Sequence, residues 1–136
     1  MGRKFSRFLS QKAGLPGEQD KEMLKMSPFF FAAMFYVYIL LSERSGHYYI
    51  GHTDDPIRRL FEHNHADEVT YTSKYRPWEL VFKYPVSGNR SDAIIIERYL
   101  KKRKSKTLLN KLILKQEDQS FMRSFIEKIL NKSRLP

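Results

Sequence analysis

Side chains that can exchange protons and bind anions are concentrated within residues 35–63 of the sequence. Tyrosine and histidine exchange protons, with ordinary pKa values of about 10 and about 6.5, and the planar guanidinium of arginine binds pairs of phosphate or carboxylate oxygens. Among the residues of these three types in the segment are Tyr38, Tyr49, Arg59 and His63. A function for the chain is therefore to be sought where these side chains meet.

Two aromatic strands and a short helix are predicted to position them. The strands are joined by residues 42–46, where polar residues and a glycine suit a hairpin turn. The sequence Asp54-Asp55-Pro56 then marks a helix start, because aspartate accepts hydrogen bonds from the free amides and proline has no amide to leave unbonded. In a helix over residues 56–63, Arg59 and His63 stand one turn apart on one face. Its expected apolar side consists of Ile57, Leu60 and Phe61.

The elements that follow complete an α+β fold. Residues 78–84 alternate well enough to form a third strand, which predicts a small three-stranded antiparallel sheet flanked by helices. Ser91 or Asp92 can cap the next helix, whose buried stripe would be Ala93, Ile96 and Leu100. Further helices are expected over residues 108–114 and 121–130. We expect a domain over residues 34–115, a flexible arm over residues 1–33 before it and a basic C-terminal helix within residues 116–136.

Composition and charge favour a compact protein that attracts polyanions. The 136 residues are 41% hydrophobic, which suits one globular domain. Residues 90–136 hold thirteen Lys or Arg and five Asp or Glu, a net charge of +8, whereas residues 34–89 have a net charge of −1. Such asymmetry attracts polyanions, of which nucleic acid is the commonest, although a lysine-rich soluble surface would look the same.

Other classes of protein are disfavoured. The apolar run over residues 29–41 is 13 residues long, whereas a membrane-spanning helix needs about 20, so no membrane partner is expected. The chain has no cysteine, which excludes a disulfide scaffold and makes a cytoplasmic location the default expectation.

An ordered set of residues resembles one family. Tyr36-Val37-Tyr38 is followed eleven residues later by Tyr49-Ile50-Gly51, and then by Arg59, His63 and Glu97. This set is similar to the GIY-YIG endonuclease domain over residues 35–113, and most similar to the small stand-alone bacterial members. Tyr36 stands where the family name has glycine, which is common among those members.

The resemblance implies a Mg²⁺- or Mn²⁺-dependent endonuclease that hydrolyses DNA phosphodiester bonds. In such a site Tyr38 and Tyr49 would frame the attacking water, and one of the two phenols would take its proton. Arg59 would stabilise the phenolate or the phosphate, and His63 would relay a proton or orient a tyrosine. Glu97 would be the sole protein ligand of a largely hydrated metal ion.

Three further residues are assigned to substrate binding: His52, Lys101 and Asn110. His52 stands where relatives place a lysine or another polar residue near the phosphate. Asn110 comes thirteen residues after Glu97, roughly where the family often has an asparagine near the metal or the phosphate.

Each of these residues also has an ordinary structural interpretation. Tyrosines on strands usually pack in the core or across strands. Glu97 and Lys101, at positions i and i+4, suit a surface ion pair, and Arg59 with Glu62 suits a solvated face. Only the joint pattern favours a nuclease.

The preferred function is a structure-selective endonuclease in DNA repair or recombination, because the basic C-terminal helices suit contact with the DNA backbone. The alternative is a non-catalytic nucleic-acid-binding module that retains the nuclease fold. A third, weaker hypothesis is a protein-interaction domain in which a partner covers the aromatic cluster of residues 29–31. The oligomeric state and the tyrosine that acts as base are left open.

Overall fold

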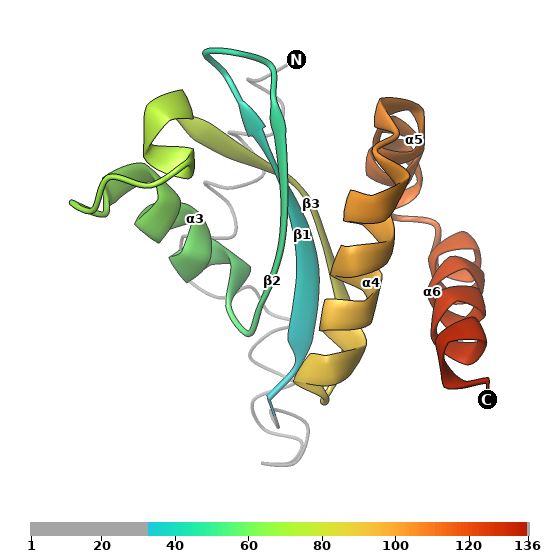
Figure 1. Ribbon diagram of the computed structural model, residues 1–136. Helices are drawn as coiled ribbons and strands as arrows, with labels where there is room; N and C mark the ends of the chain where they lie inside the picture. The colour runs from blue at the N-terminus through green and yellow to red at the C-terminus, as the bar shows by residue number, and fades with distance from the viewer. Residues whose placement is uncertain (1–32, 136) are drawn as a thin grey trace, which may run out of the picture.

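A computed structural model describes residues 33–135 and confirms the predicted α+β fold (Figure 1). Within this part of the chain, three antiparallel strands form one sheet in the order β2-β1-β3. The strands are β1 (Phe35–Ser42), β2 (Tyr48–Thr53) and β3 (Trp78–Ser87). The helices are α3 (Pro56–His65), the 3-10 helix η2 (Thr72–Tyr75), α4 (Arg90–Arg103), α5 (Lys106–Lys115) and α6 (Gln119–Arg134). The predicted arm over residues 1–33, and with it the cluster at 29–31, lies outside the described residues except for its last position.

The β1–β2 hairpin fixes the register on which the site depends. Its turn is closed by the Ser42 hydroxyl, which accepts a hydrogen bond from the Ser45 amide at 3.0 Å. Gly46 adopts a φ of 77°, a left-handed conformation that glycine adopts without steric cost. The resulting register places Tyr38 of β1 directly opposite Gly51 of β2.

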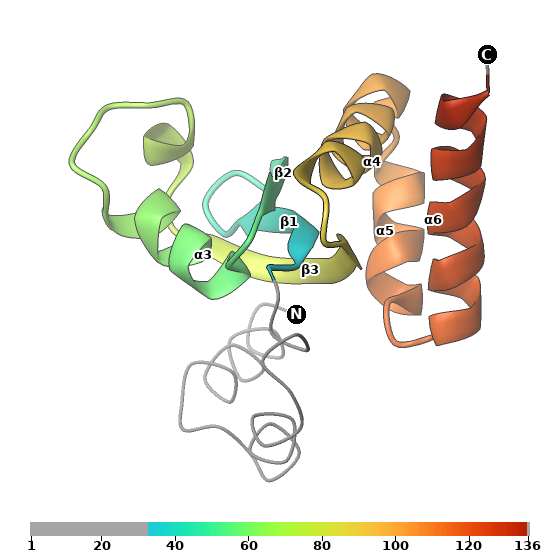
Figure 2. The ribbon, with the colours of Figure 1, turned by 90° about the horizontal axis from the view of Figure 1, so that it is seen from below.

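The central strand β1 is buried on both faces, and its alternating side chains divide the core in two. Val37 and Ile39 pack in a cluster with residues of α4, α5 and α6. Tyr38 and Leu40 pack with Trp78 and other residues on the opposite face, which α3 covers (Figure 2). Tyr38 therefore lies on the α3 side of the sheet, whereas α4 packs on the other side.

Helix α3 begins as predicted and ends two residues later than expected, at His65. The Asp55 carboxylate accepts a hydrogen bond from the Arg58 amide at 3.1 Å, and Pro56 occupies the first turn. The prediction that Phe61 belongs to the apolar side is wrong, because its side chain is 62% exposed. The buried positions of this helix are Pro56 and His63, which leaves Phe61 at the margin, where its ring stacks on His65 with centroids 4.1 Å apart.

The predicted cap of α4 is also wrong. The helix begins at Arg90, so Ser91 and Asp92 lie inside its first turn. The Asp92 carboxylate is occupied elsewhere, because it accepts hydrogen bonds from the Ser87 hydroxyl at 2.8 Å and from the Arg134 guanidinium at 3.1 Å. The predicted buried stripe is confirmed, since Ala93, Ile96 and Leu100 are each at most 1% exposed.

Helix α6 completes the larger half of the core. Its buried side chains, Met122, Ile126, Ile129 and Leu130, join the same cluster as those of α4 and α5. The division into a domain over residues 34–115 and a separate C-terminal helix stays a prediction, although α6 packs against α4 in this common core. Over the described residues, no helix combines the length and the apolar character that crossing a membrane requires.

Candidate active site

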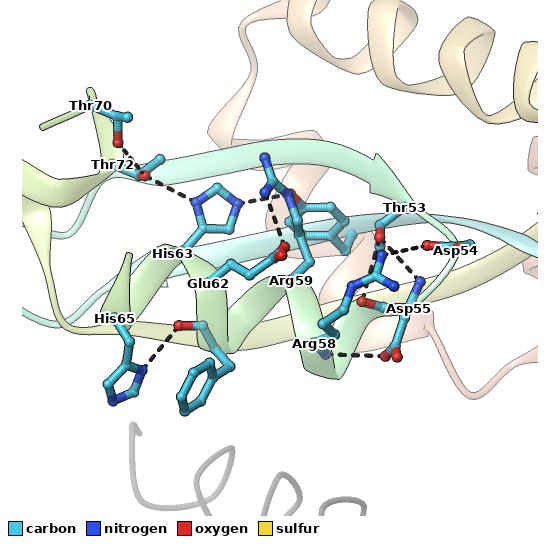
Figure 3. A network of polar contacts seen from close by, with 12 residues as sticks. Thr53, Asp54, Asp55, Arg58, Arg59, Glu62, His63, His65, Thr70 and Thr72 are labelled. Atoms are coloured by element: carbon cyan, nitrogen blue, oxygen red, sulfur yellow. Dashed lines mark hydrogen bonds and ion pairs between the residues drawn. The ribbon is translucent and has the colours of Figure 1, made fainter. Parts of the chain in front are cut away.

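A chain of polar contacts runs from the buried Tyr38 through His63 and Thr72 to Thr70 at the surface. Figure 3 shows the part of this chain from His63 to Thr70. The Tyr38 hydroxyl lies 2.9 Å from Nε2 of His63, and Nδ1 of His63 lies 3.0 Å from the Thr72 hydroxyl. Thr72 in turn contacts the Thr70 hydroxyl at 3.1 Å. The indole of Trp78 donates to the Thr72 carbonyl at 2.7 Å, which holds η2 in place beneath His63. A sheet residue, a helix residue and a loop residue are thus joined in one network.

The protonation of this network follows from its burial. Burial, reinforced by the nearby positive charge of Arg59, lowers the pKa of His63 to about 4, so the imidazole is neutral at pH 7. Burial also raises the pKa of Tyr38 above its usual value, which the Tyr49 hydroxyl reinforces and the Arg59 guanidinium opposes. Tyr38 is therefore a neutral phenol, and we assign its proton as donated to Nε2 of His63. The other ring nitrogen then donates to Thr72.

Gly51 makes room for the Tyr38 phenol. A Cβ atom at position 51 would lie 2.5 Å from the Tyr38 hydroxyl and 2.6 Å from the ring carbon that bears it. The hydroxyl therefore lies directly over the backbone of β2, where only glycine leaves space. This close approach gives the glycine of the second triplet a specific task in the site.

Tyr49, Arg59 and His63 line a common cavity of about 330 Å³ on the α3 side, here called the catalytic cavity. The Tyr49 ring packs edge-on against His63, with centroids 4.8 Å apart, and lies 6.3 Å from the Tyr38 ring. Arg59 also donates a hydrogen bond to the Glu62 carboxylate at 3.2 Å, so the predicted surface pairing exists alongside the contact with the cavity. Four of the five residues of the recognised pattern are thus brought together at this cavity or beneath it.

Glu97 approaches from the other side of the sheet, around the edge strand β2. Its carboxylate is 15% exposed and lies 3.5 Å from Nδ1 of His52 on β2 and 3.7 Å from the Lys101 ammonium. The Lys101 ammonium itself lies 5.9 Å from the centroid of the Tyr49 ring. Strand β2, which carries His52 and Tyr49, is an edge strand of the sheet. The hairpin therefore contacts Glu97 through His52, and Lys101 connects the carboxylate of Glu97 with the ring of Tyr49.

The donor set around Glu97 contains one carboxylate. Residues 33–135 contain no cluster of three or more His, Cys, Asp or Glu side chains that could hold a metal ion. Nδ1 of His52 is buried and, among the described residues, has no hydrogen-bond partner. A carboxylate with an unsatisfied nitrogen beside it suits a hydrated cation better than a fully protein-coordinated one.

Asn110 is placed by a contact that its spacing did not predict. It lies on α5, and its side-chain oxygen accepts a hydrogen bond from the Tyr48 hydroxyl at 2.6 Å. Its assignment to substrate binding, like those of His52 and Lys101, stays a prediction.

Sequence reasoning missed the loop residues of the network. Thr70 and Thr72 lie in a polar segment without periodicity, and no motif distinguishes them from their neighbours. Thr72 contacts His63, and Thr70 contacts Thr72, because two hydrogen bonds hold this segment in place. The Trp78 indole donates to the Thr72 carbonyl, and the Ser42 hydroxyl of the hairpin turn donates to the Tyr75 carbonyl at 2.6 Å.

Comparison with known proteins confirms the family that the sequence pattern resembles. A family model described as the GIY-YIG catalytic domain matches residues 34–112. The UPF0213 protein of Streptococcus pneumoniae serotype 4 (strain ATCC BAA-334 / TIGR4) is 32% identical over 92 residues, which cover 68% of this chain and 90% of that relative. No solved structure matches the chain. The chain therefore belongs to the GIY-YIG family of nuclease domains, which act on DNA.

Proposed function

We propose that this protein is a metal-dependent endonuclease that hydrolyses DNA phosphodiester bonds and selects DNA structure and not base sequence. The observation that carries the proposal is the contact of Tyr38 with a neutral, buried His63 beside a cavity that Arg59 lines. This arrangement offers an acceptor for a proton and a cation for a phosphate, which are two of the requirements of the hydrolysis.

The network supports Tyr38, in preference to Tyr49, as the base that takes the proton of the attacking water. Its hydroxyl is the one in contact with His63, so its own proton can pass to Nε2 as the water proton arrives. Thr72 accepts from Nδ1 and keeps the imidazole in the tautomer that leaves Nε2 free to accept. A phosphate in the cavity would raise the proton affinity of His63, because a nearby negative charge favours the imidazolium.

Arg59 and Tyr49 are proposed to position the phosphate and the water. The guanidinium faces the same cavity as His63 and can bind two non-bridging oxygens as their charge increases. Its partner Glu62 is a partly exposed neighbour at i+3, and such a surface pair contributes at most about 1 kcal/mol, so a phosphate can compete for the arginine. Tyr49 forms the wall of the cavity against which the substrate would rest.

The residues around Glu97 fit a Mg²⁺ or Mn²⁺ ion. Mg²⁺ is commonly bound through one or two carboxylates while it keeps several waters, and Glu97 provides one carboxylate at the edge of the site. A water of the hydrated ion would give the buried Nδ1 of His52 the hydrogen bond that it lacks among the described residues. When bound, the metal would stabilise the negative charge of the leaving oxygen. Lys101, whose side chain is 52% exposed, is free to move from the carboxylate towards the phosphate.

A role in repair or recombination, in the cytoplasm, completes the proposal. Residues 90–136 carry a net charge of +8, and contacts of lysine and arginine with phosphates bind DNA without regard to its sequence, which suits a nuclease that selects DNA structure.

The test is a cleavage panel on the full chain. Single-stranded, duplex, nicked, flapped and branched DNA are incubated with Mg²⁺, Mn²⁺ or a chelator. We expect product from at least one branched, nicked or single-stranded substrate with metal and none with the chelator. Equal cleavage of all structures would contradict structure selection, and cleavage in chelator would contradict the metal.

The second candidate is a nucleic-acid-binding module without catalysis. Its support is the net charge of −1 over residues 34–89, which leaves the positive charge of the chain mainly outside the segment that holds Tyr38 and His63. A panel in which every structure is bound and none is cut with either metal would favour it over the nuclease.

A further inference from the structure

A second cavity, of about 350 Å³, lies on the other side of Tyr49 from the catalytic cavity. It is formed between the hairpin and the turn that joins α4 to α5, and we call it the lysine cavity. Its charged lining consists of Lys101, Lys104 and Lys106, with Tyr48 and Tyr49 on the hairpin side. Tyr49 is the residue shared by both cavities, so a strand bound across Tyr49 would enter both.

The two cavities differ in charge. The catalytic cavity is lined by two arginines and two glutamates, Arg59, Arg76, Glu62 and Glu68. Its arginines are already bonded: Arg59 to Glu62 at 3.2 Å, and Arg76 to the backbone carbonyls of His63 and Ala66, each at 2.6 Å. The lysine cavity has three ammonium groups and no carboxylate in its lining.

The lysines of this cavity have little protein charge to neutralise them. Lys101 pairs with Glu97, but no carboxylate among the described residues pairs with Lys104 or Lys106. Unpaired ammonium groups converging on one hollow repel one another, and they favour a bound polyanion.

The walls of the lysine cavity are held by specific contacts. Lys104 ends α4 in a left-handed conformation with a φ of 48°, and Ser105 caps α5 by accepting from the Leu108 amide at 3.1 Å. On the hairpin side, Asn110 fixes the Tyr48 hydroxyl at 2.6 Å. These contacts place Lys104 and Lys106 on either side of a tight turn, opposite the tyrosines.

We propose, resting on the nuclease function above, that the lysine cavity binds the DNA backbone on one side of the scissile phosphate, and that residues 33–135 form no comparable phosphate site on the other side. The enzyme would hold its substrate from one side of the cut. Phosphates bound in the lysine cavity would contribute to affinity through Lys104 and Lys106. Phosphates on the other side of the cut, next to the charge-balanced catalytic cavity, would contribute little.

The first experiment measures DNA affinity as a function of salt for the full chain, using the Glu97→Gln variant to prevent cleavage. Replacing Lys104 and Lys106 together by alanine should weaken binding about 10- to 100-fold at 0.1 M salt. It should also lower the slope of log affinity against log salt by about 1.4 to 1.8. The matched control replaces Arg44 and Lys74, two exposed basic residues that line neither cavity, which removes the same charge and should leave both quantities near those of the parent. Equal losses in the two double variants would overturn the proposal.

The second experiment tests the one-sidedness. Single backbone phosphates on either side of the mapped cut are replaced by neutral methylphosphonates. We expect the cleavage rate to decrease only when the replaced phosphate lies on one side of the cut. In the Lys104→Ala, Lys106→Ala variant, replacing a phosphate on that side should no longer change the rate. Loss on both sides, or an asymmetry that survives in the variant, would contradict the proposal. If no DNA is cut, the nuclease function fails, and the salt experiment still decides whether the lysine cavity binds the backbone.

Discussion

At the scale of single residues, the proposed chemistry depends on the hydroxyl of Tyr38. The phenol of Tyr38 sits over Gly51, contacts His63 and lies near the Arg59 charge, and each of these three neighbours affects a different property. The glycine allows the position, the histidine accepts the proton and the arginine opposes the rise in pKa that burial causes. Three predictions test the hydroxyl itself, the glycine and the histidine.

Tyr38→Phe tests the base. The variant keeps the ring and removes the hydroxyl, so the cleavage rate at saturating DNA should fall about 10²- to 10⁴-fold while DNA affinity stays close to that of the parent. Tyr49→Phe is the matched control, since it removes a phenol that lines the cavity without contacting His63 through a hydrogen bond. Its rate loss should be smaller. A larger rate loss in Tyr49→Phe than in Tyr38→Phe would indicate that Tyr49, and not Tyr38, is the base.

Gly51→Ala tests the close approach. The new Cβ would lie 2.5 Å from the Tyr38 hydroxyl, so the ring must shift and the 2.9 Å contact with His63 must break. We expect a rate loss comparable to that of Tyr38→Phe and a destabilisation of about 1–3 kcal/mol, measured by denaturant unfolding. In Gly88→Ala the nearest atom would be 3.4 Å away, which serves as the control. Normal activity in Gly51→Ala would show that the hydroxyl position is unimportant.

His63 makes stability depend on pH. Its pKa is lowered to about 4 in the folded chain, whereas an unfolded histidine has a pKa of about 6.5. Between these values the unfolded chain binds more protons, so stability should be full above about pH 6.5 and should decrease as the pH falls towards 4. The melting temperature of the parent should therefore drop more between pH 7 and pH 5 than that of His63→Gln. His65→Gln, which changes an exposed histidine of the same helix, should keep the parent slope. If the melting temperature of His63→Gln changed with pH as steeply as that of the parent, the assignment of a neutral buried imidazole would be contradicted.

Residue types and spacing predicted which residues meet, but not how they are held. Tyr38, Tyr49, Arg59 and His63 were found because a hairpin and a capped helix have fixed geometry. Thr72 was not found, because its position depends on hydrogen bonds from Trp78 and from the hairpin turn, which connect segments distant in sequence. The steric role of Gly51 was equally hidden, since it depends on the strand register that places it opposite Tyr38.

At the scale of elements, the site is assembled across the edge of a sheet. The phenols lie on the α3 face, and Glu97 comes from α4 on the opposite face, where it contacts His52 of the edge strand β2. In the proposed function the position of α4 is therefore part of the catalytic geometry, and α4 packs against α6 as well as against the sheet.

Met122→Ala tests the contribution of α6 to this packing. Met122 is fully buried in the cluster shared by α4, α5 and α6, so truncation should lower the free energy of unfolding by about 2–5 kcal/mol. Arg123→Ala, which changes the exposed neighbour, should have an effect within about 0.5 kcal/mol. A small effect for both would mean that α6 is separable from the domain, as the predicted boundary at residue 115 implied.

Element types were predictable from periodicity, whereas their ends and margins were not. The alternation of residues 78–84 identified β3, but the strand continues to Ser87, through Pro85. Ser91 or Asp92 is the predicted cap of α4, but both lie inside its first turn, and the Asp92 carboxylate is held by Ser87 and by Arg134 from the far end of α6. Such pairings arise from tertiary contacts, which local sequence does not encode.

At the scale of the whole molecule, charge and chemistry are divided between the two halves of the chain. In the proposed function, the hairpin and α3 provide the proton-transferring groups, and the helices after residue 90 provide Glu97 and most of the positive charge. DNA bound by the second half would thereby be presented to the first half, so affinity and chemistry should respond to different substitutions. The charge asymmetry was visible in the sequence, but its convergence on a cavity beside Tyr49 required the turn between α4 and α5.

The most direct test of this division is the single-turnover cleavage rate of Glu97→Gln at saturating DNA with Mg²⁺, alongside its DNA affinity. Removing the carboxylate charge should lower the rate about 10²-fold or more, because the only protein ligand proposed for the metal loses its charge, while affinity changes by less than about threefold. Glu127→Gln on α6 is the matched control and should cleave like the parent. Cleavage by Glu97→Gln within a few-fold of the parent would contradict the central claim that Glu97 and the Tyr38–His63 pair form one site across β2.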